Sequence, residues 1–211
     1  MTPRVIFFDI NETLLDMQAI KTALAAVLNG DETLVDLWFA NLLHHSLVDT
    51  MSAQFHDFID IGAQSTKPGF TKISPSEELD RLGLVLDKLN DYPVLFSIDT
   101  FNYEVIKEAI NKKIDLINNV FSFSDQESFK LVCRNDIPIC VCHQGNPDNK
   151  EDIFSQINLF FSYVEEKFEK EKFNTDNIIF DPGFGYGKTP FQNLKILSNL
   201  EKLKKDRILL A

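Results

Sequence analysis

Short apolar runs recur along the chain, separated in most places by segments whose apolar residues are spaced three or four positions apart. The runs are apolar at nearly every position, which is typical of strands buried on both faces of a parallel sheet. Seven runs are present, at 5–9, 58–62, 94–99, 115–120, 137–143, 177–181 and 207–211. Helical spacing is clearest in 74–90, with Ser74 or Ser76 as a candidate helix cap, and in 151–173. The pattern predicts an α/β fold whose parallel sheet is covered by helices, with an inserted helical pair, joined at 29–33, after the first strand.

Polar residues stand at the carboxyl ends of the first six runs. They are Asp9, Asp60, Asp99, the pair Asn118 and Asn119, His143, and Asp181. One such residue is usually a turn former or a helix cap, but six at one sheet edge indicate the lining of a pocket. A closed (β/α) barrel and an open doubly wound sheet both bind ligands at this edge, so these residues predict a site without choosing between the two folds.

Composition and charge exclude several classes of partner. The net charge of the 211-residue chain is −11, which argues against nucleic acid and against anionic membrane surfaces. No apolar run approaches the roughly 18 residues of a membrane span, and the N-terminus does not resemble a signal peptide. Cys133, Cys140 and Cys142 form neither a disulfide framework nor a paired metal motif. We therefore expect buried thiols and a cytoplasmic protein.

The segment 178–190, "IIFDPGFGYGKTP", combines a strand end with three glycines and the sequence Gly-Lys-Thr. A phosphate-binding P-loop would require glycine five positions before Gly187, where this chain has Pro182. The glycines at 183, 185 and 187 also do not fit the dinucleotide fingerprint G-x-G-x-x-G. The segment therefore predicts close approach of backbone to a ligand other than a nucleotide.

The residue types at the strand ends indicate the chemistry of the ligand. Asp60, Asp99, Asn118 and Asp181 offer hydrogen-bond acceptors and amide groups, which suit a heterocycle rich in N–H donors. His143 could donate or accept. The basic residues Lys67 and Lys188 could meet an anionic group, and the acids could hold Mg²⁺ alongside phosphate. Without a family, the pattern predicts only a small polar aromatic ligand.

Five segments, in order, resemble dihydropteroate synthase. They are "FIDIGAQSTKPG", "SIDT", "LINNV", "CHQGNP" and "IIFDPGFGYGKT", within about 58–211. The resemblance implies a TIM-barrel-like fold, here incomplete with about seven strands. It also implies the transferase reaction of folate biosynthesis that joins 6-hydroxymethyl-7,8-dihydropterin pyrophosphate to p-aminobenzoate with Mg²⁺.

The resemblance also assigns roles to individual residues. Asp99, Asn118 and Asp181 would hydrogen-bond the pterin ring, with Asp60 close by, and the three aspartates would be the catalytic residues. Residues that would shape or contact the substrate pockets are Gly185 and Tyr186 for the pterin, Thr66 and Lys67 near p-aminobenzoate, and His143 and Lys188. The family usually has Arg at the position of Lys67. Lys188 is interpreted as a loop or helix-start residue rather than a phosphate clamp.

Two family segments have no counterpart in the 211 residues. The opening "NVTPDSF" segment supplies an Asn for the metal and the pyrophosphate, and the "SRK" strand end with the last strand supplies a Lys, an Arg and a His. Since those cations stabilise the leaving pyrophosphate, the sequence predicts pterin binding with weak condensation.

Residues 1–57 resemble the start of a haloacid dehalogenase superfamily protein of the 2-haloacid dehalogenase type. The resemblance is carried by "FFDINETLLD" and "LWFANLLHHSLVDT". It would make Asp9 a nucleophile, although Asn11 replaces the second Asp of phosphatase relatives and Phe39 stands where the dehalogenase cap has Arg. Asn11 would also fall near the metal-binding Asn of the synthase family, if 5–16 occupies the place of the first barrel strand.

The chain is therefore interpreted as a chimera of a dehalogenase-like unit, 1–57, and a pterin-binding partial barrel, 58–211. Two alternatives remain open, a 2-haloacid dehalogenase-like hydrolase acting through Asp9 and a non-catalytic fusion product. The first and last runs would form open sheet edges, which favour association of two copies.

Overall fold

One parallel sheet organises the molecule. The computed structural model describes residues 7–9, 58–66, 69–87, 95–146 and 151–209. Within them, six strands lie in sequence order and every neighbouring pair is parallel. The strands are β1 (Phe7–Asp9), β2 (Phe58–Gly62), β3 (Leu95–Asp99), β4 (Leu116–Asn119), β5 (Ile139–Cys142) and β6 (Ile178–Asp181). The predicted parallel α/β architecture is confirmed, including the parallel pairing of β3 with β4.

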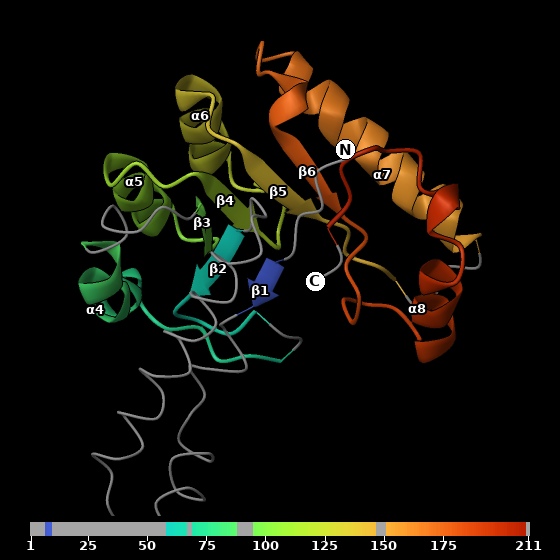
Figure 1. Cartoon of the computed structure of the whole chain (residues 1–211), viewed down its shortest axis with the longest axis horizontal. Helices are drawn as coiled ribbons and strands as arrows, with labels where there is room; N and C mark the ends of the chain where they lie inside the picture. Colours follow the sequence, from blue (N-terminus) through green and yellow to red (C-terminus); the bar gives the residue numbers. More distant parts are fainter. Residues whose placement is uncertain (1–6, 10–57, 67–68, 88–94, 147–150, 210–211) are drawn as a thin grey trace, which may run out of the picture.

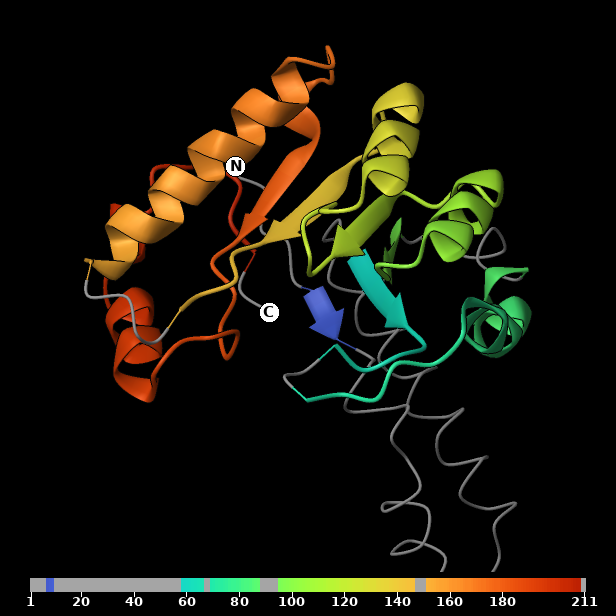
Figure 2. The ribbon, with the colours of Figure 1, turned by 180° about the vertical axis from the view of Figure 1, so that it is seen from behind.

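Helices follow most of the strands. They are α4 (Pro75–Leu86), α5 (Tyr103–Asn111), α6 (Gln126–Asn135), α7 (Ile153–Glu169) and α8 (Pro190–Leu197), with the short 3₁₀ turns η2 (Thr175–Asn177) and η3 (Leu200–Lys202). Helices α4 to α7 lie along one side of the curved sheet (Figure 1 and Figure 2). Ser74 is the N-cap of α4, because its hydroxyl accepts a hydrogen bond from the Glu77 N–H at 3.1 Å. Helices α4 and α7 thus form within the predicted segments 74–90 and 151–173.

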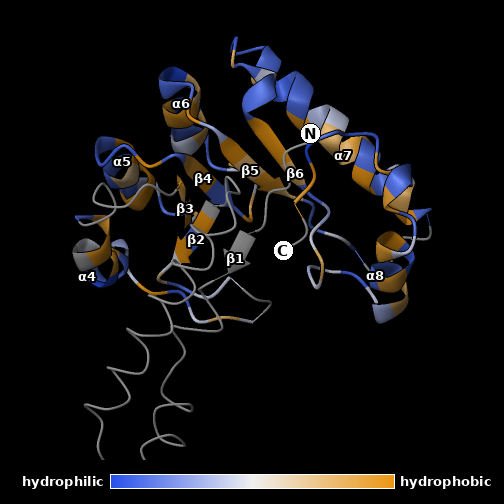
Figure 3. Cartoon of the chain, in the orientation of Figure 1, coloured by the Kyte–Doolittle hydropathy of each residue, from blue (hydrophilic) through white to orange (hydrophobic). Residues whose placement is uncertain are grey.

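The register of the strands separates two faces of the sheet. Paired residues such as Ile98 with Ile117, and Val141 with Phe180, belong to the large core that the helices cover. Residues of the opposite parity, Leu116 and Cys140, pack with Leu209 in a second, smaller cluster. Both faces are apolar on β5, where Ile139–Cys142 are all buried, so that strand shows no alternation in the sequence. On β2 and β3 the second face carries Asp60, Ser97 and Asp99 instead. Figure 3 shows hydrophobic positions on β5 and β6, and both hydrophobic and hydrophilic positions on the helices that cover the sheet.

The seventh predicted strand is reduced to a single bridge among the described residues. Ile208 pairs in parallel with Phe180. The Phe180 N–H donates to the Arg207 carbonyl at 3.0 Å, and the Leu209 N–H donates to the Phe180 carbonyl at 2.9 Å. Six strands and one bridge in the part of the chain that the structure describes, which does not include 210–211, agree with the prediction of about seven strands.

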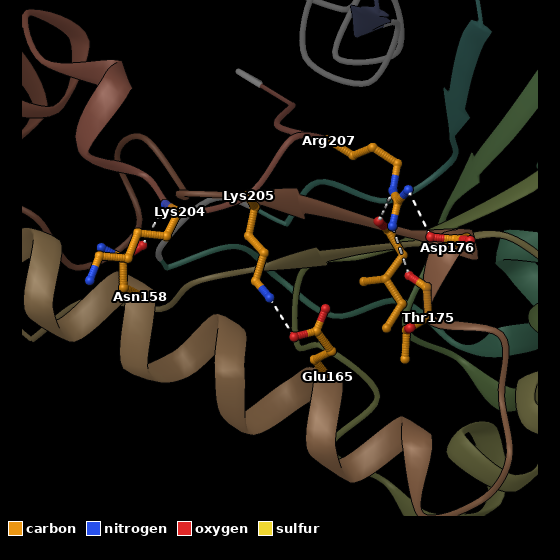
Figure 4. Close-up of polar contacts among 8 residues, drawn as sticks. Asn158, Glu165, Thr175, Asp176, Lys204, Lys205 and Arg207 are labelled. Atoms are coloured by element: carbon orange, nitrogen blue, oxygen red, sulfur yellow. Dashed lines mark hydrogen bonds and ion pairs between the residues drawn. The ribbon is translucent and has the colours of Figure 1, made fainter.

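Side-chain contacts hold the segment before this bridge against its neighbours (Figure 4). Lys205 donates to Glu165 of α7 at 2.5 Å, and Lys204 donates through its backbone N–H to Asn158 at 2.9 Å. Arg207 donates to the Thr175 carbonyl at 3.0 Å and to Asp176 at 3.2 Å. The segment 204–209 is thereby anchored beside β6.

The first strand occupies the place expected for it. β1 pairs in parallel with β2, with Asp9 opposite Asp60 in backbone register. The interpretation that the N-terminal run takes the place of a first barrel strand is therefore confirmed for the backbone of 7–9. The predicted helical pair, Asn11 and the dehalogenase-like cap lie outside the described residues.

Candidate functional site

Four of the polar residues predicted at the strand ends lie on the inner face of the sheet, opposite the helices. The register pairs Asp60 with Ser97, Asp99 with Asn118, and Asp181 with Cys142. Asp60, Asp99 and Asp181 are buried, and Asn118 is half-buried. The Asn118 side-chain amide donates to Asp60 Oδ2 at 2.8 Å. The sheet thus gathers three carboxylates and one amide near its carboxyl edge, above the apolar cluster of Leu116.

Neighbouring groups hold the Asp181 carboxylate in place. Its Oδ1 accepts a hydrogen bond from the Gly183 N–H at 2.7 Å, and its carboxyl also bonds the Cys142 thiol. Burial raises the pKa of Asp181 to about 6, although these two hydrogen bonds and the charge of Lys188 act to lower it. Asp181 is therefore a fixed acceptor that titrates close to neutral pH.

The glycine-rich loop after β6 folds tightly against the loop after β5. Gly183 and Gly187 have positive φ angles of +69° and +60°, which glycine adopts without strain. A Cβ on Gly187 would stand 2.1 Å from the Gly145 carbonyl oxygen, and one on Gly183 would stand 2.3 Å from the His143 carbonyl oxygen. Two of the three glycines are thus required for contact between two backbone segments, whereas Gly185, at φ +78°, has nothing within 4 Å of its Cβ position.

Lys188 ties the same two loops together. Its ammonium group donates to the carbonyls of Gly183 at 2.7 Å, His143 at 2.9 Å and Tyr186 at 3.2 Å. The side chain is buried, and burial lowers its pKa to about 8 against the opposing charges of Cys142 and Asp181. All three ammonium donors are used by backbone carbonyls, which fits the interpretation of Lys188 as a loop residue rather than a phosphate clamp.

The loops after β2 and β6 meet through Thr66 and Tyr186. The two hydroxyl groups are 2.9 Å apart and hydrogen-bonded. Thr66 is buried and Tyr186 is half-buried, and burial raises the pKa of the tyrosine above its ordinary value. The contact brings two predicted site residues together across the inner face. Lys67, which follows Thr66, lies outside the described residues.

His143 lies apart from this arrangement. Its ring packs edge-on against Phe160 of α7 at a centroid distance of 5.3 Å, and it lines a cavity of about 530 Å³ together with Gln156 and Tyr163. Burial, and to a smaller extent the charge of Lys188, lowers the pKa of His143 to about 4, so the imidazole is neutral at physiological pH. Sequence reasoning grouped this ring with the carboxylates, whereas the structure places it on the helix-covered side of β5.

The described residues offer no cluster of side chains for a metal ion. Among the described residues, no group of three or more His, Cys, Asp or Glu side chains could hold a metal ion. Asn11, the predicted metal residue, lies outside them, and only the backbone of Asp9 is described. The three cysteines are free, in agreement with the expectation of thiols.

Sequence reasoning missed three residues that shape the site. The Cys142 thiol contacts the Asp181 carboxyl, whereas its sequence pattern indicates only a buried thiol in an apolar strand. Glu78 and Thr100, the residue after Asp99, form a buried hydrogen bond of 2.6 Å. A signal for Glu78 was present, because it lies four and eight residues before Leu82 and Leu86, on the apolar side of α4.

Known proteins resemble this chain in sequence and in fold. The family of pterin-binding enzymes matches residues 43–210. The dihydropteroate synthase of Clostridium beijerinckii is 34% identical over 156 residues, which cover 70% of this chain and 56% of that protein. The Escherichia coli dihydropteroate synthase is 30% identical over 171 residues, covering 74% of this chain and 61% of that protein. The chain thus spans about three fifths of the length of these relatives.

Solved structures show the same fold. The crystal structure of Yersinia pestis dihydropteroate synthase in a sulfonamide drug complex superposes with a TM-score of 0.69 at 30% identity. The superposition covers 76% of this chain and 61% of that one.

Among the described residues, no helix is long and apolar enough to cross a membrane.

Proposed function

We propose that this chain, which belongs to the family of pterin-binding enzymes, binds a pterin on the inner face of its sheet. The observation that carries the proposal is the gathering of Asp99, Asn118 and Asp181 on that face. Carboxylates accept hydrogen bonds only, so they select a ring that presents N–H donors. The Asn118 amide, held by Asp60, adds a group that recognises both donors and acceptors.

The remaining inner-face groups favour a flat ligand. The loop after β6 carries Gly185 and Tyr186, and the Thr66–Tyr186 hydrogen bond places a polar contact between the loops after β2 and β6. We infer that these two loops border the ring, with Thr66 and Lys67 on the side of the second substrate. The buried thiol of Cys142 beside Asp181 adds apolar surface.

The reaction that we propose is the condensation of 6-hydroxymethyl-7,8-dihydropterin pyrophosphate with p-aminobenzoate. The amine nitrogen forms a bond to the methylene carbon, the carbon–oxygen bond to pyrophosphate breaks, and the amine proton passes to solvent. The carboxylates and the amide would orient the pterin, because a fixed approach geometry lowers the barrier. Lys188 contributes by holding the glycine-rich loop, since its three donors bind carbonyls.

Magnesium enters only as part of this proposal. The described residues form no metal cluster, so they do not by themselves fit the ion. We propose that Asn11 and the pyrophosphate oxygens would be its ligands, where Mg²⁺ would neutralise charge on the leaving group. The roles derived above for Asp99, Asn118 and Asp181 do not depend on the ion.

The chimeric organisation stays a proposal as well. We propose the division into 1–57 and 58–211 and the dehalogenase-like origin of the first part. β1 belongs to the same sheet as β2, so in this proposal the first part contributes a strand to the barrel. The family match begins at residue 43, so the proposed boundary at 57 rests on the sequence resemblance alone. A cytoplasmic location fits the free cysteines.

Binding of a pterin is the direct test of this function. Isothermal titration of the 211-residue chain with 6-hydroxymethylpterin should show saturable binding, and a second titration should include pyrophosphate and Mg²⁺. Release of pyrophosphate from the pterin substrate with p-aminobenzoate would then establish condensation. A chain that is folded by circular dichroism but binds no pterin would overturn the proposal.

Pterin affinity is expected to fall as the pH drops below about 6. A ring N–H donates to the ionised Asp181 carboxylate, so the ligand favours the ionised form and competes with the proton. Because the pKa of Asp181 is about 6, affinity should be highest above that pH and decrease about tenfold per unit well below it. Titrations from about pH 5 to about pH 8 measure the profile. A profile that keeps full affinity at the acidic end would contradict the role of Asp181.

Association of two copies is expected from the sheet edges. β1 pairs with β2 on one side, and the 207–209 segment makes one bridge to β6 on the other. Edge strands leave backbone donors and acceptors ready to pair. Light scattering should therefore report a mass above that of the 24.2 kDa monomer. A single monomeric species at high concentration would count against this proposal.

A further inference from the structure

We propose that Glu78 of α4 is a positioning residue that fixes the turn after β3 and, through it, the Asp99 carboxylate. The inference rests on the proposed pterin site and deepens it. Glu78 has no exposed surface, whereas the side chain of its neighbour Glu77 is 51% exposed and pairs with Arg81. An acid that is fully buried one residue from a solvent-exposed acid requires a specific explanation.

The contacts of Glu78 lead directly to the site. The Thr100 hydroxyl donates to Glu78 Oε1 at 2.6 Å, and the Asn102 side-chain amide donates to Oε2. Thr100 is also buried, and its N–H donates to the Asn118 carbonyl at 3.0 Å. The residue that follows Asp99 is thus held by α4 on one side and by β4 on the other, so its backbone has little freedom.

The Asn102 side chain contacts Glu78 and does not cap its own helix. It is the N-cap of α5, where an Asn side chain normally accepts a hydrogen bond from the first turn. No such bond is formed here. At the other described α-helices, the N-cap side chains do accept from the first turn; these caps are Ser74, Asp125, Asp152 and Thr189. The Asn102 amide bonds Glu78 instead, and departures of this kind tend to mark functional positions.

The chemistry of a carboxylate explains why an acid stands at this position. Thr100 and Asn102 are both neutral donors, and a carboxylate accepts from both without offering a donor of its own. Burial raises the pKa of Glu78 against the two hydrogen bonds, so the group is costly for the fold. Well-packed apolar side chains often replace buried charges without loss of stability. An acid at position 78 therefore orients the turn, and this orientation comes at a cost in stability.

The same helix also holds the loop after β2. Arg81, three residues after Glu78, donates to the Ala63 carbonyl at 2.9 Å, and this loop continues to Thr66. Within the loop, the Gln64 side chain accepts from the Ile73 N–H at 2.8 Å. One turn of α4 thus contacts both the loop after β2 and the turn after β3, which makes it a common support for the two.

Three variants test the role of Glu78. Glu78→Ala removes both acceptors, and Glu78→Gln keeps one acceptor for Thr100 while Asn102 can turn its amide to match. Val132→Ala truncates a fully buried residue of α6 outside the site and serves as the stability control. The measurements are affinity for 6-hydroxymethylpterin by calorimetry, the thermal unfolding midpoint, and hydrogen exchange of the Thr100 amide without ligand.

A positioning role predicts that Glu78→Ala weakens pterin binding about tenfold or more and speeds exchange at Thr100. Glu78→Gln should recover most of the affinity, and Val132→Ala should leave both readouts near wild type despite a lowered unfolding midpoint. If the wild type binds the pterin and Glu78→Ala binds it equally well, the positioning role of Glu78 is wrong and the proposed function stands. Absence of binding by the wild type overturns the proposed function and the positioning role with it.

Discussion

Replacing Gly187 by alanine is expected to destabilise the protein by about 2–5 kcal/mol. A left-handed backbone costs a non-glycine residue roughly 1–2 kcal/mol. The added Cβ would also stand 2.1 Å from the Gly145 carbonyl oxygen, and relieving such overpacking costs about 1–3 kcal/mol further. Both contacting groups are backbone, so no side chain can rotate away. Urea unfolding followed by circular dichroism measures the loss in free energy of unfolding.

Gly185 supplies the matched control in the same loop. Its φ is +78°, yet nothing lies within 4 Å of its Cβ position. Gly185→Ala should therefore cost only the backbone penalty of about 1–2 kcal/mol. Equal losses for the two variants would show that the close approach of the Gly145 and Gly187 segments does not contribute.

Asp181→Ala is expected to weaken pterin binding by about 1–3 kcal/mol, because it leaves a ring donor without its acceptor. The fold should lose little stability. The pKa of Asp181 in the native state, about 6, lies above its ordinary value of 3.8, so the native state holds the proton more tightly than the unfolded chain. At neutral pH the buried charge therefore opposes folding, and its removal offsets the lost hydrogen bond of the Gly183 N–H.

Pterin affinity and stability should respond differently to Asp181→Ala, and both quantities have to be measured. Calorimetry with 6-hydroxymethylpterin gives the affinity, and thermal unfolding gives the stability, for Asp181→Ala and for Asp80→Ala. Asp80 is an exposed carboxylate on α4, so its loss should change neither quantity. Asp99→Ala should resemble Asp181→Ala in affinity. Wild-type affinity in the Asp181 variant would remove this carboxylate from the pterin site.

Much of the fold could be predicted because buried parallel strands leave a strong signal. Six of the seven apolar runs became strands, with ends close to those expected. The run 207–211 has the same composition, but in the described residues it makes a single bridge through Ile208. Composition alone cannot show how far a strand pairs with its neighbour, since pairing depends on where the adjacent strand ends.

The sequence could not predict which side chains of a strand point toward the site. Cys142 and His143 are neighbours at one strand end, yet the thiol contacts Asp181 and the imidazole packs on Phe160. A strand apolar on both faces shows no alternation, so nothing in "ICVCH" reveals which residue faces the site. Register decides it, because a shift of one position exchanges the two faces.

Long-range partners explain the remaining differences. Glu77 and Glu78 are equivalent as acids in the first turn of a helix, but only Glu78 meets Thr100. Lys188 follows a glycine, as a phosphate-binding lysine would, and its three carbonyl partners come from two loops. The Glu78–Thr100 contact spans 22 positions and the Lys188–His143 contact spans 45, and no local pattern encodes either of them.

The order of strands in the sheet has a consequence for how the chain folds. Because neighbours in the sheet are neighbours in the sequence, each pairing from β2 onward closes a single strand–helix–strand unit, and short closures favour rapid folding. Only the pairing of β1 with β2 spans the longer segment 10–57. A chain emerging from the ribosome can therefore pair β2 with β3 before β6 has been synthesised. The inner-face carboxylates described here would then be placed in the order of synthesis, Asp60 before Asp99 and Asp181 last.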